Sequence, residues 1–282
     1  MKIKELFKMV LIVVCLAGCS KDDDASSQKS EMDYYTVTNT IGTIPGYIDI
    51  VKNTVKDNKL VLQTMTNNNG EESITVQYIY NGGKLSLVKT TYISDENFYY
   101  DSAGRLIGIS SINNYGENDY YRFVHVSDRL VFAEILDGPY SDADVHIYNR
   151  AILEFDADDN VSKAGFDNDL DGQMDYPAYY SYDNRGNVVS VQFNNGETMP
   201  YEYSDVWNNV NILNANTYGK RGWRLKDAFN FAGGLFSNCP NLFAYDLTKD
   251  SYEVLPGGFY KKKTHVRDAA QQWIVTTEFF FK

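Results

Sequence analysis

A short turn motif recurs along the middle of the chain, and it constrains the fold more than any other feature of the sequence. Each copy has an aromatic residue, then Asp or a similar polar residue, then small or polar residues that end in Gly, and then an aliphatic residue. Asp accepts hydrogen bonds from backbone N–H groups two residues on, and Gly tolerates a positive φ, so the motif predicts the turn of a bulged β-hairpin. Full or partial copies occupy residues 78–85, 99–106, 124–130, 154–161 and 181–188, and residues 201–205 form a decayed sixth copy.

The segments beside these turns alternate between apolar or aromatic residues and polar residues. Residues 59–65 and 73–80 are two examples, with aliphatic, β-branched or aromatic side chains at every second position. Alternation of this period predicts β-strands. Because an isolated hairpin is only marginally stable in water, several must pair side by side. We therefore expect an all-β fold: an antiparallel meander of repeated β-hairpins that forms a curved or partly closed sheet, with a small C-terminal cap.

The last part of the chain, residues 207–282, departs from the repeat pattern of residues 34–206, and all three Trp residues lie in it. Asn208-Asn209 indicates the beginning of a loop, and residues 223–231 are expected to form a short helix that ends at Gly233-Gly234. Residues 259–266 and 273–281 alternate well enough to predict a final hairpin. We expect this stretch to pack as a cap on one end of the sheet, within the same domain as the repeats.

The N-terminal segment has the features of a cleavable signal peptide. Residues 1–18 combine early lysines with an apolar run at 9–16, which is shorter than the about 20 residues that span a bilayer. The run ends in Leu16-Ala17-Gly18-Cys19, which resembles the bacterial lipobox. The resemblance implies a diacylglyceryl group on Cys19 and a further acyl chain added after cleavage, and two or more chains anchor a protein stably. The alternative is an uncleaved transmembrane anchor that contains a Cys by chance.

Residues 19–33 are predicted to form a lipidated, flexible acidic tether. The run Ser20-Lys21-Asp22-Asp23-Asp24 follows the Cys directly, and it resembles the surface-export signal of Bacteroidota lipoproteins. The alternative is a solvated linker that carries a few charges. Together, the lipobox and the acidic run predict a protein of the outer membrane that is lipid-anchored and exposed at the cell surface.

The turn motif itself resembles the YD repeats of Rhs-type proteins, whose consensus has a Tyr-Asp pair, two variable residues, Gly and an aliphatic residue. Residues 100–106 and 182–188 fit this consensus closely, whereas the other copies depart from it at the Asp or the Gly. With the lipobox and the acidic run, the chain resembles a family of Bacteroidota surface lipoproteins of unknown function with degenerate YD/Rhs-like β-hairpin repeats. The resemblance covers roughly residues 55–205, and it implies an antiparallel meander and no known activity.

The acidic composition argues against two classes of partner. The formal net charge is −12, and it becomes more negative when the lysine-rich signal peptide is removed. A surface of this sign argues against nucleic acid and against anionic membrane patches. Cysteine is scarce, because Cys15 leaves with the signal peptide and Cys19 carries lipid, so Cys239 has no partner for an intrachain disulfide. Cys239 lies in a partly apolar stretch and is expected to be a buried packing residue.

The sharpest ligand motif lies at residues 167–175. Oxygen-bearing side chains occur at alternate positions, Gly172 allows a sharp turn, and hard oxygen donors suit Ca²⁺. The expected ligands are Asp167, Asp169, Asp171, the backbone carbonyl of Gln173, and Asp175. The last ligand position of an EF-hand is occupied here by Ala178, and no flanking helices are expected, so the motif predicts a weak structural Ca²⁺ site similar to the short loops of extracellular repeat proteins. The alternative is an acidic turn that binds no ion tightly.

Pairs of adjacent tyrosines are a second feature of the strands. They occur at residues 34–35, 99–100, 120–121 and 179–180. Neighbours in a strand point to opposite faces, so one ring of each pair should point away from the main core. Exposed rings could stack on sugars of a glycan. The alternative is cross-strand packing on a second, half-buried face.

The sequence contains no motif for catalysis. It has no HExxH, GxSxG, Walker or CxxC pattern, and His125, His146 and His265 are not spaced as a site. We therefore expect no catalytic residues and no enzymatic activity. The leading interpretation is a non-catalytic surface lipoprotein that binds a polysaccharide or a surface protein. The alternatives are a structural component of an outer-membrane assembly, with an envelope protein as its partner, and a polysaccharide hydrolase that uses two of the many carboxylates.

Overall fold

The computed structural model describes residues 32–42, 48–66, 71–91, 94–112, 118–139, 144–234, 238–244, 246–270 and 272–281. The expected signal peptide (1–18), the lipidation site Cys19 and nearly all of the tether lie outside these residues. Strands make up 59% of the structure, which confirms the all-β fold. No helix in the described ranges is both long enough and apolar enough to cross a membrane.

The elements follow one another along the chain with short connections. The strands are β1 (Met32–Ile41), β2 (Ile48–Lys56), β3 (Lys59–Thr66), β4 (Glu72–Asn81), β5 (Lys84–Thr90), β6 (Asp95–Tyr100), β7 (Leu106–Ile112), β8 (Asn118–His125), β9 (Leu130–Leu136), β10 (Ile147–Phe155), β11 (Val161–Phe166), β12 (Asp175–Tyr182), β13 (Val188–Gln192), β14 (Thr198–Pro200), β15 (Tyr203–Trp207), β16 (Asn241–Phe243), β17 (Ser251–Val254), β18 (Tyr260–Asp268) and β19 (Trp273–Phe281). The helices are α2 (Asn209–Tyr218), α3 (Lys220–Lys226), α4 (Ala228–Ala232) and α5 (Asp246–Lys249).

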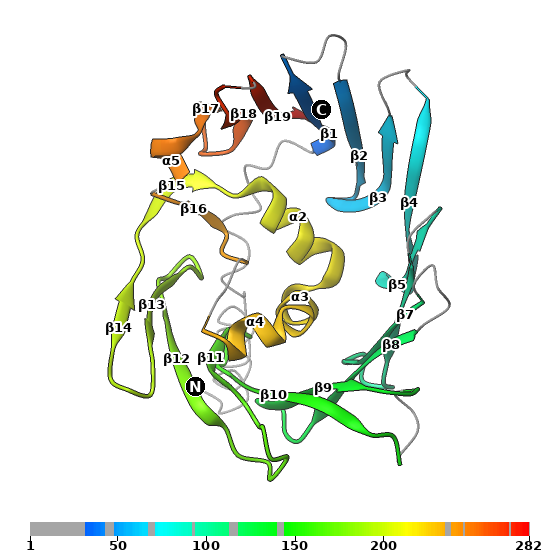
Figure 1. The fold of residues 1–282 in the computed structure, drawn as a ribbon, viewed down its shortest axis with the longest axis vertical. Coiled ribbons are helices and arrows are strands. Elements are labelled where there is room, and N and C mark those ends of the chain that lie inside the picture. The colour runs from blue at the N-terminus through cyan, green and yellow to red at the C-terminus, as the bar shows by residue number, and fades with distance from the viewer. Residues whose placement is uncertain are drawn as a thin grey trace, which may run out of the picture.

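The large sheet has 17 strands and is built as a meander. Each strand from β1 to β13 pairs antiparallel with the next one along the chain. The last strand, β19, returns to pair with β1, and β18 and β17 continue the sheet beyond it. The sheet therefore curls round on itself but does not close, and its two edges are β14 and β17. Figure 1 shows the separate β15–β16 ribbon between these edges.

Helices α2, α3 and α4 occupy the inside of the curled sheet, as Figure 1 shows, whereas α5 lies at its edge beside β17. Helix α2 contacts β3 and β5, and α4 contacts β10, β11 and β12. This differs from the expected cap on one end of the sheet. A sheet this strongly curved has an apolar concave face, which must be shielded from water. A segment inside the curve can contact more strands than a segment at one end of the sheet.

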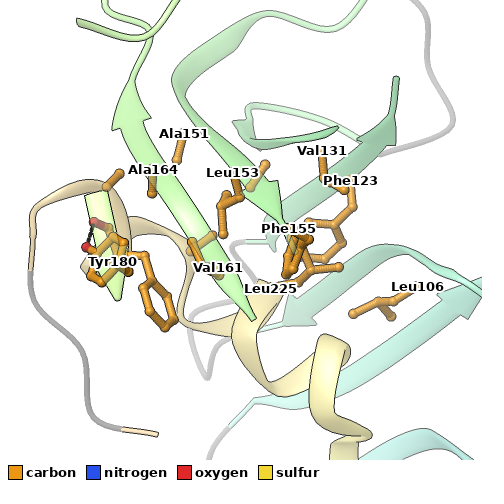
Figure 2. Packing of buried hydrophobic residues seen from close by; sticks show 14 of the residues in the cluster. Leu106, Phe123, Val131, Ala151, Leu153, Phe155, Val161, Ala164, Tyr180 and Leu225 are labelled. Atoms are coloured by element: carbon orange, nitrogen blue, oxygen red, sulfur yellow. Dashed lines mark hydrogen bonds between the residues drawn. The ribbon is translucent and has the colours of Figure 1, made fainter. Parts of the chain in front are cut away.

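The main core forms where these helices meet the sheet. Leu225 of α3 and Phe231 of α4 are almost fully buried beside Phe155 and Val161 of the sheet. Figure 2 shows Leu225 next to Phe155. The hydroxyl of Tyr180 donates a hydrogen bond to the backbone carbonyl of Phe231 in α4. Full burial of one such apolar side chain contributes about 1.5–3 kcal/mol, so the helices stabilise the curved shape directly.

The recurring motifs close hairpins as the sequence predicts. In the best copy, Asp183 Oδ1 accepts hydrogen bonds from the backbone N–H groups of Arg185 and Asn187, both at 2.9 Å, and Gly186 has a φ of +85°. Because a meander alternates direction, every second connection lies at the same end of the sheet. The motif turns therefore share one end, which we call the turn rim, and the intervening connections of the meander lie at the opposite end, which we call the far rim.

Two local predictions were wrong, and a third was only partly right. Residues 201–205 form no turn, and most of them belong to β15. A turn lies instead at 193–197, between β13 and β14 and therefore at the far rim, where Gly196 has a φ of +84° and Phe193 N–H donates to the Glu197 carbonyl over 2.8 Å. Asn208 does not begin a loop, because its side chain caps α2 by accepting from Asn211 N–H. The helix expected at 223–231 is divided between α3 and α4 at Asp227. The final hairpin is confirmed as β18–β19.

Candidate functional site

The acidic loop of residues 167–175 connects β11 to β12 at the far rim. Its backbone turns because Gly172 adopts a φ of +86° and donates its N–H to Asp167 Oδ2 over 3.0 Å. Asp169 and Asp171 each accept from the backbone N–H two residues on. As a result, one carboxylate oxygen from each of Asp167, Asp169 and Asp171 lies within 4.8 Å of the other two.

Asp167 is completely buried, unlike the two exposed aspartates beside it. Its Oδ2 accepts from Arg150 Nη1 over 2.9 Å, and Arg150 is also paired with the buried Glu134 at 2.8 Å. Glu134 is paired in turn with Arg122 at 2.6 Å. Burial lowers the pKa of Arg150, but the hydrogen bonds to Asp167 and Glu134 raise it by more than burial lowers it. The pKa of Arg150 therefore lies above its usual value. Paired charges of this kind hold Asp167 in a fixed position, since an unpaired buried charge is costly.

The second oxygen of Asp167 is in a different situation. Asp167 Oδ1 is buried and has no hydrogen-bond partner among the described residues. Native proteins satisfy most buried acceptors, so an exception needs an explanation such as an ion or an ordered water. Of the two oxygens of Asp167, Oδ1 is therefore the one without a hydrogen-bond donor in the described part of the chain.

The remaining two expected ligands behave differently. Asp175 Oδ2 accepts from the backbone and side-chain amides of Asn168, at 2.9 and 3.1 Å, so this oxygen closes the base of the loop. The side chain of Gln173 donates to Asp171 Oδ2 over 2.9 Å. The structure therefore brings together three of the four expected carboxylates, and it sets Asp175 to hold the loop ends.

A concave pocket of about 530 Å³ lies inside the curled sheet, toward the far rim. Strands β1, β18 and β19, the beginning of α2 and the segment around α5 form its walls. Lys263, His265 and Arg267 alternate along β18 and therefore share one face of the strand. Six of its polar lining residues are Asn39, Asn211, Asp246, Lys263, His265 and Arg267.

Two of these side chains are held by a carboxylate beside the pocket. Asp250 accepts from Lys263 Nζ at 2.7 Å and contacts His265 Nδ1 at 2.6 Å. Burial raises the pKa of Asp250, but the hydrogen bonds from Lys263 and His265 outweigh this effect and hold its pKa below the usual range. Asp250 is therefore ionised at neutral pH, and it neutralises much of the positive charge of β18.

Arg267 has a different environment. Its guanidinium lies over the ring of Trp273, 4.5 Å from the ring centroid, and its side chain is exposed. The indole Nε1 of Trp273 is buried and has no hydrogen-bond partner in the described part of the chain. Arg267 thus offers exposed hydrogen-bond donors in the lining of the pocket.

A second, shallower hollow of about 410 Å³ lies near the β15–β16 ribbon. It is lined by Tyr201, Glu202 and Phe243 among others, and Asp246 borders both hollows. Its rings already pack on one another, since Tyr201 lies tilted against Phe243 with centroids 6.0 Å apart.

The two tyrosines of a pair point to opposite faces of their strand, as alternation requires. Tyr180 is buried, with 6% of its surface exposed, whereas Tyr179 is 44% exposed. Tyr35 is likewise buried, but its neighbour Tyr34 stacks on Phe280 across the strands, with ring centroids 4.3 Å apart. Both expected roles of the second ring therefore occur, solvent exposure in one pair and cross-strand packing in the other.

Two single residues from the sequence analysis have clear places. Cys239 is buried, as expected, and burial raises the pKa of its thiol. The histidines are not spaced as a site in the sequence, yet the structure pairs His265 with Asp250. The sequence signal for this pair is faint. Lys263, His265 and Arg267 occur at alternate positions of β18, and Asp250 directly precedes the neighbouring strand β17.

No family model matches the chain, and no curated protein matches it. Among solved structures, the chain is similar to one described as a porin-like protein from Bacteroides uniformis. The sequence identity is 9%, the alignment covers 90% of this chain and 97% of that chain, and the TM-score is 0.39.

Proposed function

We propose that this chain is a lipid-anchored protein of the outer membrane, exposed at the cell surface, that binds a segment of polysaccharide in the concave pocket. The observation that carries the proposal is the polar lining of this pocket, which combines amide, carboxylate and cationic side chains from four separate parts of the fold. Pockets for drug-like ligands are mostly apolar, so a lining of this kind suits a ligand covered with hydroxyl groups.

The chemistry of the lining matches that of a sugar. Hydroxyl groups both donate and accept hydrogen bonds, and the side-chain amide of Asn39 does the same. Asp246 accepts only, and Arg267 donates only. The pocket therefore offers partners of every kind that a chain of sugars requires, at a curved surface that can hold several units.

We propose binding without catalysis. A glycosidase needs two carboxylates on either side of the scissile bond. Of the described residues that line the pocket, Asp246 is the one carboxylic acid. Asp250, beside the pocket, has both oxygens engaged by Lys263 and His265, so neither oxygen is available to transfer a proton to a substrate.

The proposed location rests on the lipobox at Cys19 and the acidic run behind it. Lipid on Cys19 would hold the protein at the membrane, and the flexible tether would let the folded domain stand away from it. A binding site at one rim of the sheet would then be accessible to polymers outside the cell.

The test uses the mature lipoprotein purified in detergent and a panel of polysaccharides. We expect at least one polysaccharide to bind, and Arg267→Ala to weaken that binding by at least about tenfold, which corresponds to about 1.4 kcal/mol. Arg185→Ala is the matched control, because Arg185 is an exposed arginine of the turn rim that pairs only with the exposed Asp205 in the described structure. Binding by neither protein, or equal binding by wild type and Arg267→Ala, would contradict the proposal.

A further inference from the structure

The acidic loop concentrates negative charge at one point of the far rim. Three carboxylate oxygens lie within 4.8 Å of one another, each from a different aspartate. Like charges at this distance repel, and the repulsion is strongest where water is excluded. A cation at their centre would turn this repulsion into attraction.

A second observation, independent of the clustering, points to a ligand. Asp167 has none of its surface exposed, and its Oδ1 is buried without a hydrogen-bond partner among the described residues. Its Oδ2 is already occupied by Arg150 and Gly172. A fixed carboxylate with one satisfied and one vacant oxygen is the arrangement expected of a metal ligand that is oriented by neighbouring hydrogen bonds.

Arg150 does not remove the need for a cation. Its guanidinium is shared between Asp167 and Glu134, and Glu134 is also paired with Arg122, so this network balances the charge of Asp167 but not the charges of the other two aspartates. Asp169 and Asp171 have no ion pair in the described structure. The loop therefore keeps a net negative charge next to the vacant oxygen.

We propose that this loop binds one Ca²⁺ ion through carboxylate oxygens of Asp167, Asp169 and Asp171, with the Gln173 carbonyl and water completing the shell. Ca²⁺ accepts six to eight oxygen ligands in flexible geometry, whereas Mg²⁺ requires a near-ideal octahedron. An exposed loop with few protein ligands fits the first requirement better than the second. Because the loop is tied through Arg150 to β9 and β10, the ion would stiffen this part of the far rim.

The experiment is a titration of the mature lipoprotein with Ca²⁺ and, separately, with Mg²⁺, followed by calorimetry. We expect one Ca²⁺ site with a Kd of about 10⁻⁴ to 10⁻³ M, the range of extracellular calcium modules. Binding of Mg²⁺ should be at least about tenfold weaker. If no Ca²⁺ binds even at a concentration about ten times the largest expected Kd, the proposal is overturned.

The double variant Asp169→Asn, Asp171→Asn identifies the site. Both side chains are exposed and outside the buried ion pairs, so the protein should fold with a Tm close to that of the calcium-free wild type. We expect this variant to lose Ca²⁺ binding, and the control Asp158→Asn, an exposed turn residue at the other rim, to keep it. Unchanged binding by the double variant would overturn the assignment to this loop.

Amide hydrogen exchange on the wild-type protein adds a readout that does not depend on a variant. We expect Ca²⁺ to slow exchange at residues 168–174 and to leave the turn-rim motif at 183–187 unchanged. Equal exchange at residues 168–174 with Ca²⁺ and with chelator would contradict the proposal. Neither result depends on a polysaccharide, so this test and the test of the proposed function succeed or fail separately.

Discussion

The hydroxyl of Tyr182 donates a hydrogen bond to the backbone carbonyl of Val161, 2.9 Å away, in the neighbouring hairpin. Tyr80 makes the same contact with the carbonyl of Leu60 at 2.6 Å. In each case the aromatic residue before a turn reaches the aliphatic residue after the preceding turn of the turn rim. The motif thus does more than close one hairpin, because its ring also links that hairpin to the one before it.

Removal of this link should destabilise the sheet. Tyr182→Phe leaves the Val161 carbonyl without its side-chain donor, so we expect the free energy of unfolding to fall by about 1–2 kcal/mol. Urea denaturation, monitored by fluorescence, measures this free energy of unfolding. Tyr179→Phe is the control, since this ring is 44% exposed and its loss of a hydroxyl should change stability by less than about 0.5 kcal/mol. Equal effects of the two variants would show that the hydroxyl of Tyr182 has no special role.

The same tyrosines should make the fold sensitive to alkali. Burial raises the pKa of Tyr80 to about 12, although a hydrogen bond with Thr217 lowers it in part. In the unfolded chain the pKa is about 10. The contribution of Tyr80 is therefore fully present below about pH 10, and it is lost as the pH rises toward 12. Thermal melts should show a Tm that falls less steeply over this window in Tyr80→Phe than in wild type.

The control for the alkaline melts is Tyr176→Phe. Tyr176 is 77% exposed, so its removal should leave the wild-type slope of Tm against pH. Parallel slopes for wild type and Tyr80→Phe would contradict the assignment of this sensitivity to Tyr80.

The buried ion network should be far more sensitive to mutation than a surface pair. Glu134→Gln removes the buried carboxylate that Arg122 and Arg150 share, although Arg150 keeps its pair with Asp167. We expect a loss of about 3 kcal/mol or more, because one half of a buried pair is left uncompensated. Glu154→Gln on the adjacent strand breaks only a half-exposed pair with Lys163 and should cost less than about 1 kcal/mol. Chemical denaturation of both variants measures the difference, and similar losses would be inconsistent with the network.

Helix α3 should act as part of the core that fills the concave side. Leu225 is 2% exposed, so Leu225→Ala should lower the free energy of unfolding by about 2–5 kcal/mol through lost burial and a residual cavity. Leu247→Ala in α5 is the comparison, since Leu247 is 39% exposed. Calorimetric melts of the two variants measure the contrast. A small effect at Leu225 would mean that the helices do not support the sheet.

Local features of the fold could be predicted from the sequence, because their determinants lie within a few residues. The turn at Asp183 follows from Asp and Gly at fixed spacing, and the final hairpin follows from alternation. The choice of residues 201–205 as a sixth turn failed for an instructive reason. That segment contains the Tyr and Asp of the motif but no Gly, whereas the neighbouring segment 193–197 has the Gly that a positive φ requires.

Long-range features could not be predicted in this way. Strand β19 pairs with β1, so Val37 lies opposite Thr277 although 240 residues separate them, and no local pattern encodes such a partner. The pocket depends on this pairing, since its walls combine Asn39 with residues of β18 and β19. For the acidic loop, spacing was enough to predict that three carboxylates would meet. It could not indicate that Asp167 would be buried against Arg150, because Arg150 lies on another strand.

The most direct test of the proposed function is to locate the bound polysaccharide by amide hydrogen exchange on the mature lipoprotein. With the best ligand of the panel at saturation, we expect slower exchange at residues 208–211 and along 263–267 and 273–277, which surround the concave pocket. Exchange around the exposed Tyr179 should stay the same. Protection confined to the strand of Tyr179, with none around the pocket, would contradict the account and move the binding site to the outer face of the sheet.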